Sequence, residues 1–406
     1  MRQLRAIVPL RIVSTILAAA AAPVAVASGY LLLLTLRSRR REAPTCGEPR
    51  TRFQVIVPAH DEAAGIAHTV ESLRGIDYPR DLYEVVVVAD NCTDDTAARA
   101  NAAGARVLER FDDKLRGKGY ALAHAFDACI GEGKAEAVVV VDADTLVSSN
   151  LLRAFDARLQ MGAKAVQADY AVRNPDEGWR TRLMAIAFGM FHVVRSTGRE
   201  SLGVSCGLRG NGMCFSTELL EEVPHDAFSV VEDLEYGIRL GEHGHRVHYA
   251  GEAHVYGEMV ASEKASRSQR ARWEGGRLQM AKRHAIPLLK RAIEERDPVL
   301  ADLAIDVLIP PLSVLVMATA VGAAASAALA VLTRRPNLAL ILFGASGVCL
   351  AAYAARGWQV SGTGGRGLAT LCYAPVYMAW KATLGLRRTR KSPDEWVRTS
   401  RRGDSR

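Results

Sequence analysis

The chain carries long uncharged runs near its two ends and an ordinary mixture of apolar and charged residues between them. Residues Ile12–Leu36 form an uncharged run of 25 residues, which predicts a helix about 37 Å long, enough to cross a bilayer. Near the other end, uncharged runs cover Val307–Thr333 and Pro336–Ala355, separated by Arg334 and Arg335. We therefore expect one membrane anchor followed, much later in the chain, by a membrane-spanning hairpin.

A last uncharged run, Gly367–Trp380, has only 14 residues. That length suits an interfacial helix better than a span. The basic cluster RSRRR follows Leu36 directly, and the C-terminal tail is also strongly basic. Positive charge favours the cytoplasmic side, so these clusters predict a cytoplasmic middle region and tail in the bacterial inner membrane. A cleaved signal peptide is the competing interpretation of the first run, because Ala25 and Ala27 resemble a cleavage site.

Between residues 50 and 298 the pattern is that of strands alternating with helices. Valine-rich segments predict strands, and segments with helical spacing lie between them. The expected strands are FQVIVP (53–58), EVVVVAD (84–90), ARVLER (105–110) and AVVVVDADTL (137–146), and the expected helices are 63–74, 97–103 and 117–130. Continuous apolar strands separated by helices are typical of a buried, mostly parallel sheet in an α/β fold.

Acidic residues follow three of these strands. Glu62, Asp90 and the pair Asp142 and Asp144 come just after strand ends. Ligands of open parallel sheets bind beyond the carboxyl ends of the strands, so we expect these side chains to meet in one crevice. Two carboxylates one residue apart can hold Mg²⁺ or Mn²⁺. The alternative for such a pair is helix or turn capping.

Composition excludes several functions. The net charge of +8 is concentrated beside the apolar runs, and aromatic residues make up only 6%, which favours anionic lipid over nucleic acid. The seven cysteines contain no CxxC pair, so they are expected to be buried thiols. GKGYAL lacks the GxxxxGK[ST] pattern of a phosphate loop. The histidines of GEHGHRVHYA have no second ligand cluster, and a helix leading into a strand explains them better than zinc.

Seven short motifs occur in order through the middle region. They are VIVPAHDE (55–62), VVADNCTDDT (87–96), GKGYAL (117–122), DAD (142–144), GNGMCFS (210–216), VED (231–233) and QRARW (269–273). This set resembles glycosyltransferase family 2, the inverting nucleotide-sugar enzymes with the GT-A fold. QRARW resembles the (Q/R)xxRW motif of cellulose, chitin and hyaluronan synthases and of ceramide glucosyltransferases. The flanking apolar runs fit membrane-integrated members.

The resemblance implies a role for each matching position. Donor-binding residues would be Val57, Pro58, Glu62, Asp90, Lys118, Asp142 and Arg272. The metal, Mg²⁺ or Mn²⁺, would be held by Asp144 with Asp142. Asp233 would be the general base, with Glu232 beside it. Acceptor-binding residues would be Gly210, Asn211, Gly212, Gln269 and Trp273.

Elementary chemistry agrees with these roles. An attacking hydroxyl needs a base within hydrogen-bond reach, and adjacent carboxylates raise each other's proton affinity. A departing diphosphate needs cations such as the metal and the guanidinium of Arg272. One acid of Glu232–Asp233 also suits a helix N-terminus, and QRARW suits a basic membrane-facing helix. The glycines of GNG would allow the backbone to approach a ligand closely. The alternative is that they only form a turn.

We expect three regions: an N-terminal anchor with its basic segment (1–49), a cytoplasmic GT-A domain (50–298) and a C-terminal hairpin, interfacial helix and basic tail (299–406). The expected reaction moves a sugar from a nucleotide-diphosphate donor to a glycan or lipid-linked acceptor in polysaccharide or cell-envelope synthesis, and the resemblance implies a UDP-sugar as the donor. Two rivals stay open. One is transfer of a single sugar to a membrane lipid, and the other is an inactive membrane scaffold that kept the fold. A transporter is disfavoured because the apolar runs carry no ionisable residues.

Overall fold

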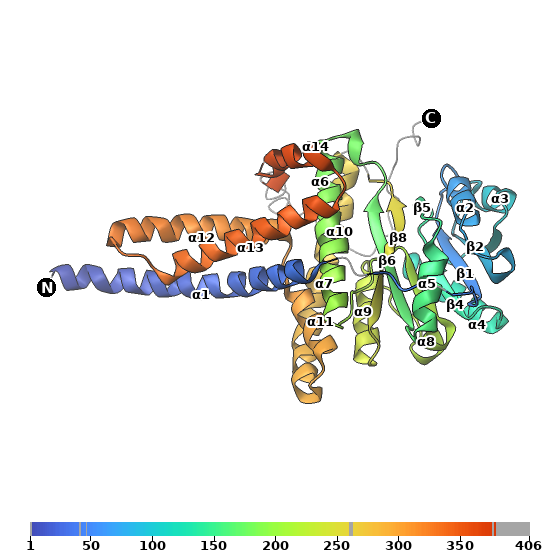
Figure 1. Cartoon of the computed structure of the whole chain (residues 1–406), viewed down its shortest axis with the longest axis horizontal. Helices are drawn as coiled ribbons and strands as arrows, with labels where there is room; N and C mark the ends of the chain where they lie inside the picture. The colour runs from blue at the N-terminus through green and yellow to red at the C-terminus, as the bar shows by residue number, and fades with distance from the viewer. Residues whose placement is uncertain (1, 40–41, 46, 260–262, 376, 379–406) are drawn as a thin grey trace.

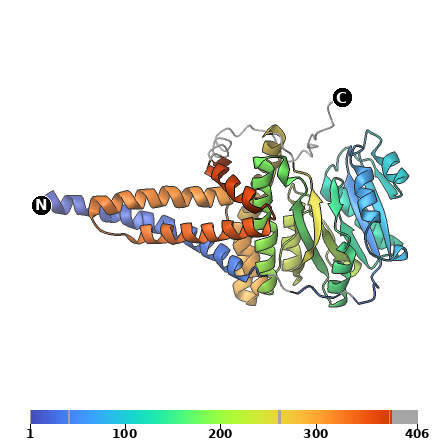
Figure 2. The same ribbon diagram turned by 45° about the horizontal axis from the view of Figure 1, so that its top comes forward.

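The structure is a computed structural model that describes residues 2–39, 42–45, 47–259, 263–375 and 377–378, without the side chains of 2–9 and 263–274. It has two parts: an α/β domain and a rod of three long helices that projects from one side of it (Figure 1). Figure 2, turned by 45°, shows the same separation between the α/β domain and the rod.

An eight-stranded mixed sheet forms the centre of the α/β domain, in the order β3-β2-β1-β4-β7-β6-β8-β5. The strands are β1 (Phe53–Ala59), β2 (Tyr83–Asp90), β3 (Arg106–Arg110), β4 (Ala137–Val140), β5 (Thr145–Val147), β6 (Ala165–Val172), β7 (Met213–Ser216) and β8 (Val247–Gly257). The pairs β1–β2, β1–β4, β2–β3 and β6–β8 are parallel, whereas β7 and β5 run antiparallel to their neighbours. The expected mostly parallel α/β sheet is confirmed.

Helices cover the sheet because both of its faces are apolar. Alternate residues of β1 and β4 enter different cores: Val55 and Val139 pack on one face, and Ile56 and Val140 on the other. Burying both faces explains why the strands read as unbroken apolar runs. The helices of this domain are α2 (Ile66–Arg74), α3 (Thr96–Ala102), α4 (Lys118–Glu132), α5 (Leu151–Gln160), α6 (Trp179–Phe188), α7 (Arg195–Ser201), α8 (Thr217–Glu222) and α9 (Glu232–Glu242).

The stretch AVVVVDADTL forms two strands instead of the single one expected. β4 ends at Val140, Asp142–Asp144 lie in a turn, and β5 then pairs antiparallel with β8 at the far edge of the sheet. Four short helical turns complete the described fold. They are three 3₁₀ turns, η1 (Arg80–Leu82), η2 (Pro175–Glu177) and η4 (Leu371–Tyr373), and one π-helix, η3 (Gly189–Val194), between α6 and α7.

Three helices are long and apolar enough to cross a membrane: α1 over Leu10–Arg37 within Arg2–Arg37, α12 (Leu312–Thr333) and α13 (Leu338–Val360). They pack along one another, with Phe343 of α13 against Gly322 of α12. The ring lies 2.2 Å from where a Cβ at Gly322 would stand, so only glycine allows this approach.

The uncharged run that begins at Val307 is divided by Pro310 and Pro311. Its first residues end α11 (Pro298–Leu308), which lies against α10 (Glu263–Glu295), and α12 starts only at Leu312. Consecutive prolines lack the backbone N–H groups that would continue a helix. The last uncharged run begins within the short helix α14 (Gly364–Thr370) and continues into η4, and its residues 376, 379 and 380 lie outside the described part of the chain.

Candidate active site

The carboxyl ends of β2, β1 and β4 bring acidic residues to one edge of the sheet. Because these strands are neighbours and parallel, the loops after Asp90, Ala59 and Val140 emerge side by side. The segment before β7 and the start of α9 complete the site from the other half of the sheet. The strand ends that carry these acids therefore lie at one edge of the sheet, and their role as a binding site stays a prediction.

The side chain of Asn211, which is fully buried, supports the turn Asp142–Asp144 by hydrogen bonds. The Asn211 Oδ1 accepts a hydrogen bond from the Asp142 backbone N–H at 3.1 Å, and its Nδ2 donates to Thr145 Oγ1 at 2.8 Å. The side chain of Asn211 thus fixes the backbone of the turn. Direct contact of Asn211 with an acceptor stays a prediction, and both of its side-chain polar atoms already have partners.

Lys118 joins the acids that come from different strands and helices. Its Nζ lies 2.5 Å from Asp142 Oδ1 and 3.7 Å from Glu232 Oε1, and it donates to the carbonyl oxygen of Gly210. Burial opposes the charged form, but Asp142 and Glu232 outweigh it and raise the pKa of Lys118. A lysine ammonium therefore lies between the DAD turn and the start of α9, where it could attract an anionic group.

Glu232 and Asp233 begin α9, as the sequence predicted. Burial, with the neighbouring Asp233, raises the pKa of Glu232 to about 7 against the attraction of Lys118. Burial also raises the pKa of Asp233, opposed by the Leu234 N–H, by Lys118 and by Arg209. Carboxylates whose pKa values are raised accept a proton more readily, which is what a general base needs near neutral pH.

Gly210 and Gly212 allow the chain to pass close to these acids. Both have positive φ, 76° and 69°. A Cβ at Gly210 would lie 3.5 Å from Asp233 Oδ2, and one at Gly212 would lie 2.8 Å from a methyl group of Val255. The GNG motif is therefore a turn that faces Asp233, and close approach of its backbone to a ligand stays a prediction.

Asp90 presents an unsatisfied oxygen at the end of β2. The side chain is fully buried; its Oδ1 accepts from Arg110 Nη1 at 2.6 Å and from Asn91 Nδ2 at 3.2 Å. Its Oδ2 is buried with no hydrogen-bond partner among the described residues. A buried lone acceptor is costly, and the N–H of a bound nucleobase would satisfy it. Val57 and Pro58 are buried beside this edge in β1.

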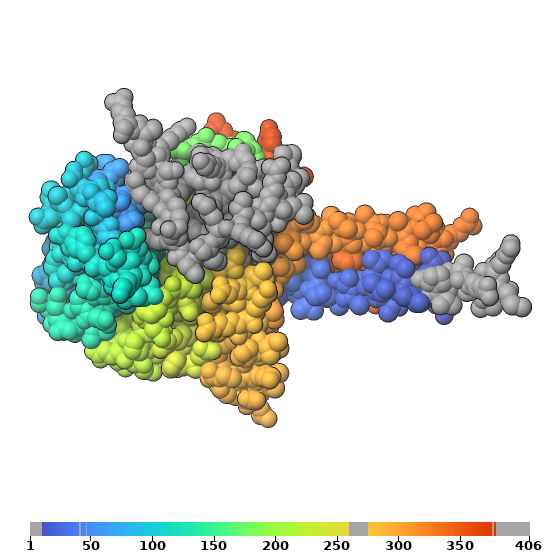
Figure 3. All heavy atoms as spheres, turned by 180° about the vertical axis from the view of Figure 1, so that it is seen from behind, coloured from blue at the N-terminus to red at the C-terminus, as the bar shows by residue number. Residues whose placement is uncertain are grey.

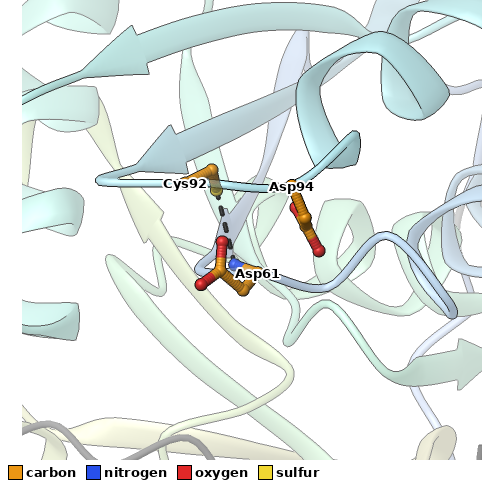
Figure 4. Close-up of side chains that lie close together, drawn as sticks. All are labelled: Asp61, Cys92 and Asp94. Atoms are coloured by element: carbon orange, nitrogen blue, oxygen red, sulfur yellow. Dashed lines mark hydrogen bonds between the residues drawn. The ribbon is translucent and has the colours of Figure 1, made fainter. Parts of the chain in front are cut away.

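The loops after β1 and β2 are fastened to each other by Asp61 and Asp94, which lie with Cys92 in Figure 4. Ligand atoms of these three residues lie within 4.8 Å of one another. However, Asp61 already accepts from the Thr93 N–H at 2.6 Å, and Asp94 from the Ala63 N–H at 3.1 Å and the Thr96 N–H at 3.0 Å. These bonds explain the cluster as a loop clasp. They also hold the start of α3, and Glu62 N donates to Thr96 Oγ1 in the same clasp.

The residues suited to a divalent cation are Asp142 and Asp144. Both side chains are half-buried and leave β4 in one turn. Carboxylate oxygens are the donors that Mg²⁺ and Mn²⁺ prefer, so the donor set fits such an ion. The histidines of GEHGHRVHYA form no such set: His245 lies 2.8 Å from Glu222 and His248 lies 3.6 Å from Glu200, on separate partners.

The motif QRARW falls in the first half of α10, where the side chains of Gln269, Arg272 and Trp273 lie outside the described residues. The backbone there is helical. The next described residues return to the site: a Cβ at Gly276 would lie 2.7 Å from the Val231 side chain, one residue before Glu232. Helix α10 thus packs directly against the start of α9.

A buried ionic network beneath the site was not predicted from the sequence. Arg195 and Arg199 of α7 pair with Asp306 and Asp302 of α11, and Arg199 Nη2 lies 2.6 Å from Asp302 Oδ2. Tyr30 of α1 donates to Asp302 Oδ1 at 2.7 Å, which ties a membrane helix to the network. The two arginines are four residues apart in RSTGR, and the two aspartates are four residues apart in DLAID. This matching spacing of opposite charges on two helices was the sequence signal that could have indicated the network.

Two further arginines extend the network toward the site. Arg277 of α10 lies 3.3 Å from Asp306 Oδ2, and the guanidinium of Arg209 stacks over the Phe191 ring at 4.4 Å. Arg209 directly precedes Gly210, so the network ends where the GNG turn faces Asp233. Burial lowers the pKa of Arg209 to about 10, helped by Arg199 and Arg195. The group still stays charged at neutral pH.

Replacing Asp306 by asparagine is expected to destabilise the protein by about 3–5 kcal/mol, because it removes a buried negative charge from among the arginines. Burial alone would raise the pKa of Asp306, but Arg195, Arg199 and Arg277 lower it well below its usual range. Thermal unfolding in detergent measures the effect. The exposed Glu294→Gln is the control and should change stability by less than about 0.5 kcal/mol. An Asp306→Asn protein as stable as the control would contradict the network's importance.

Replacing Glu232 by glutamine is expected to flatten the dependence of stability on pH. The folded pKa of Glu232, about 7, lies above its ordinary value of 4.5. The folded state therefore binds this proton more tightly than the unfolded state, and stability falls as pH rises from about 4.5 to 7. Melting temperatures of the wild type and the variant, measured across this range, should converge at low pH and separate as pH rises, with the variant higher. Parallel curves would show that Glu232 does not titrate there.

The fold and the acidic site define a GT-A protein, the class of nucleotide-sugar-dependent glycosyltransferases. Residues 49–276 match the family described as Glycosyltransferase like family 2, and the chain belongs to this family. The resemblance found in the seven motifs is thus confirmed.

Named relatives share the catalytic region. The chain is 30% identical over 238 residues to a beta-monoglucosyldiacylglycerol synthase of Synechocystis, covering 56% of this chain and 48% of that protein. It is 24% identical over 234 residues to the probable glycosyltransferase YdaM of Bacillus subtilis, covering 55% of each. The chain thus spans about half the length of these curated relatives.

A solved structure resembles more of the chain. The mannosyltransferase PcManGT of Pyrobaculum calidifontis, in complex with GDP-Man and Mn²⁺, superimposes with a TM-score of 0.51 at 22% identity. The match covers 90% of this chain and 99% of that one. At this identity the likeness establishes the fold.

Proposed function

We propose that the protein is an inverting, membrane-integrated glycosyltransferase that uses a nucleotide-diphosphate sugar, a UDP-sugar by family resemblance. One observation carries this proposal. Lys118 gathers Asp142, Glu232 and the Gly210 carbonyl into one site at the carboxyl edge of the sheet. The division into an anchor (1–49), a catalytic domain (50–298) and a C-terminal membrane region (299–406) belongs to the same proposal, with the catalytic domain in the cytoplasm and the spans in the bacterial inner membrane.

In the proposed mechanism each group acts where the fold places it. Asp90 holds the nucleoside through its unsatisfied oxygen. Lys118, and by family resemblance Arg272, would supply positive charge to the diphosphate that leaves. Asp233, with its raised pKa, takes the proton of the acceptor hydroxyl as oxygen attacks the anomeric carbon. Mg²⁺ or Mn²⁺ held by Asp144 and Asp142 would neutralise charge that develops on the leaving diphosphate. The acceptor would lie beside Gly210, and Gln269 and Trp273 would bind it by family resemblance.

Two acceptors remain within this proposal: a growing glycan or lipid-linked saccharide, and a membrane lipid that receives one sugar. The relative named as a monoglucosyldiacylglycerol synthase supports the second. The described part of the chain also has only three candidate spans, fewer than we would expect around a channel for an emerging polymer. We therefore place single transfer to a diacylglycerol-type lipid beside glycan transfer as a candidate of equal standing.

A nucleotide-release assay on detergent-purified full-length protein tests the proposal. UDP-, GDP- and dTDP-sugars are each offered with Mn²⁺ or Mg²⁺, with and without EDTA, and with either diacylglycerol or a bacterial lipid extract as acceptor. Metal-dependent release from one donor supports the transferase. A single-sugar product on diacylglycerol supports the glycolipid synthase. If no donor of the panel releases its nucleotide and UDP also fails to bind in a metal-dependent manner, the inactive-scaffold interpretation replaces both.

A further inference from the structure

Residues 224–230 form an irregular segment that leads into the start of α9, where Glu232 and Asp233 lie. We call this segment the α9 lead. Among the described residues, no hydrogen bond between backbone groups joins the α9 lead to another part of the chain. Its position, and with it the approach to the two acids, therefore depends on side-chain contacts and on close packing.

Two helices, α4 and α9, hold the α9 lead. Its contacts with α9 only fasten the lead to the helix into which it continues. Its contacts with α4 fix it relative to the rest of the site, because the first turn of α4 also carries Lys118. The contacts with α9 include Asp226–Arg239 and Ser229–Glu235, and those with α4 include His225–Phe126, Ala227–Gly119 and Phe228–Tyr120.

The ring of Phe228 stacks on the ring of Tyr120 in the first turn of α4. The two ring centroids are 4.2 Å apart, and the ring planes differ by 9°. Phe228 is 44% exposed, and both rings lie outside the two apolar cores that cover the sheet. One aromatic stack is strong enough to dock an exposed segment and too weak to decide whether a domain folds. The pair is therefore suited to holding the α9 lead rather than to stabilising the whole fold.

Gly119 allows the α9 lead to come this close to α4. A Cβ at Gly119 would collide with the carbonyl oxygen of Ala227 and would lie 3.2 Å from the Cα of Phe228. Ala227 is fully buried at this contact. Glycine is usually unfavourable inside a helix, so the close approach of the α9 lead gives a physical reason for its place in the first turn of α4.

Tyr120 also contacts Arg110, the last residue of β3. The guanidinium carbon of Arg110 lies 6.0 Å from the centroid of the Tyr120 ring, which is the limit of a cation–π contact. The largely buried side chain of Arg110 donates to Asp90 Oδ1 at 2.6 Å. The second oxygen of Asp90 is the one without a partner among the described residues. Two side chains thus join Asp90, the proposed nucleoside contact, to Phe228 of the α9 lead.

Lys118 is a second link between α4 and the acids, but a bound donor would disturb it. Its Nζ lies 3.7 Å from Glu232 Oε1 and 2.5 Å from Asp142 Oδ1. A diphosphate would compete with both carboxylates for this ammonium group. The stack of Tyr120 on Phe228 involves no ionised group, so it can hold the approach to α9 while the ionic contact changes.

We propose that Tyr120 is a positioning residue for the reaction. It docks Phe228 and so holds the α9 lead, which keeps Asp233 in place for the acceptor hydroxyl. Bound nucleotide strengthens the docking, because a nucleobase N–H on Asp90 orders Arg110 and, through it, the Tyr120 ring. The role in the reaction and the response to nucleotide rest on the proposed function, whereas the docking itself does not.

The stack lies away from the membrane helices. Helix α4 is at the end of the α/β domain that is far from the rod (Figure 1). In the space-filling view from behind, the turquoise surface around α4 adjoins the yellow-green surface of α8 and α9 (Figure 3). Substitutions in the stack therefore leave the attachment of the membrane helices to the domain unchanged.

Fluorine NMR of the full-length protein in detergent measures the docking without using activity. Trifluoromethylphenylalanine replaces Phe228, and UDP with Mg²⁺ is the nucleotide probe. The ring current of Tyr120 should shift the resonance of the docked label relative to its position in Tyr120→Leu, and Tyr120→Phe should restore the shift. Gly119→Ala should reduce the docked signal, because its Cβ pushes the α9 lead away. Saturating UDP should increase the docked signal in the protein with Tyr120 and leave Tyr120→Leu unchanged.

Steady-state kinetics separate positioning from structural support. Tyr120→Leu should lower kcat about 3–10-fold, the range expected from the loss of one aromatic stack, while UDP affinity changes by no more than about threefold. Tyr120→Phe should keep the wild-type kcat. Phe228→Leu should resemble Tyr120→Leu, and the double variant should lose little more, because both substitutions remove the same contact. Phe111→Leu is the matched control: Phe111 is 70% exposed, and its loss should change neither quantity.

Three results would overturn the inference. The first is a label with the same shift in the wild type and in Tyr120→Leu, which would show that the rings do not stack in solution. The second is a docked signal that does not respond to bound UDP. The third is equal kcat in Tyr120→Leu and Tyr120→Phe, or a loss of kcat that only follows a lower melting temperature. Failure of the proposed function is a separate result: the wild-type protein then binds no UDP and releases no nucleotide from any donor, and the positioning role falls with it.

Discussion

Replacing Asp233 by asparagine is expected to lower kcat by about 10²–10⁴-fold, the usual contribution of a general base. The amide is almost the same size and cannot accept the proton of an acceptor hydroxyl. Donor binding should stay within about threefold of the wild type, because Asp142, Lys118 and Asp90 are untouched. Initial rates of nucleotide release with saturating acceptor measure kcat, and UDP binding by calorimetry measures the second quantity.

Glu235→Gln provides the matched control for this experiment. Glu235 lies in the same first turn of α9, and its side chain accepts the Ser229 N–H at 3.1 Å, which a glutamine oxygen can also do. The control removes one negative charge from the helix N-terminus and costs no more than the usual few tenths to 1 kcal/mol of that interaction. If Asp233→Asn and Glu235→Gln lowered kcat equally, Asp233 would be a helix-end charge and another group would be the base.

Much of this site follows from local sequence because its acids sit directly after strands. Once 53–58, 84–90 and 137–141 are recognised as neighbouring parallel strands, the carboxyl ends of all three must lie at one edge. Asp90, Asp142 and Asp144 were found for that reason. Glu232 and Asp233 were found through the VED motif of the family resemblance, and a helix start was the alternative role for one of them. Their meeting with Lys118 could not be derived from spacing, because it depends on the path of the chain across the sheet.

The parts that the sequence did not predict depend on long-range pairing. β5 is three residues long, and its partner β8 is more than a hundred residues away, so no local pattern marks it. The buried arginines look like surface residues in the sequence, since arginine is rarely buried without a partner. Only the fold brings Arg199 to Asp302 and both to Tyr30 of the first membrane helix.

Replacing Asp144 by asparagine is the second substitution with a large expected effect. The wild-type protein should bind UDP at least tenfold more tightly with Mn²⁺ than with EDTA, because carboxylate oxygens are strong ligands for this ion and the ion in turn neutralises the diphosphate. The variant keeps the shape of the side chain but loses its charge. Its UDP affinity should therefore be weak and nearly equal in Mn²⁺ and in EDTA, and added Mn²⁺ should not restore nucleotide release.

The hydrogen bonds of the DAD turn allow the loss of Mn²⁺-dependent UDP binding in Asp144→Asn to be attributed to the missing carboxylate. Asn211 holds the backbone of Asp142 and the side chain of Thr145 on either side of Asp144, so the turn should keep its conformation in the variant. An unchanged melting temperature without metal would verify this. Asp77→Asn is the matched control, since that aspartate is exposed and pairs with Arg153 at 3.0 Å far from the DAD turn; its Mn²⁺ response should equal that of the wild type. A Mn²⁺ response that survives in Asp144→Asn would move the metal to other oxygen ligands and leave Asp144 as a turn residue.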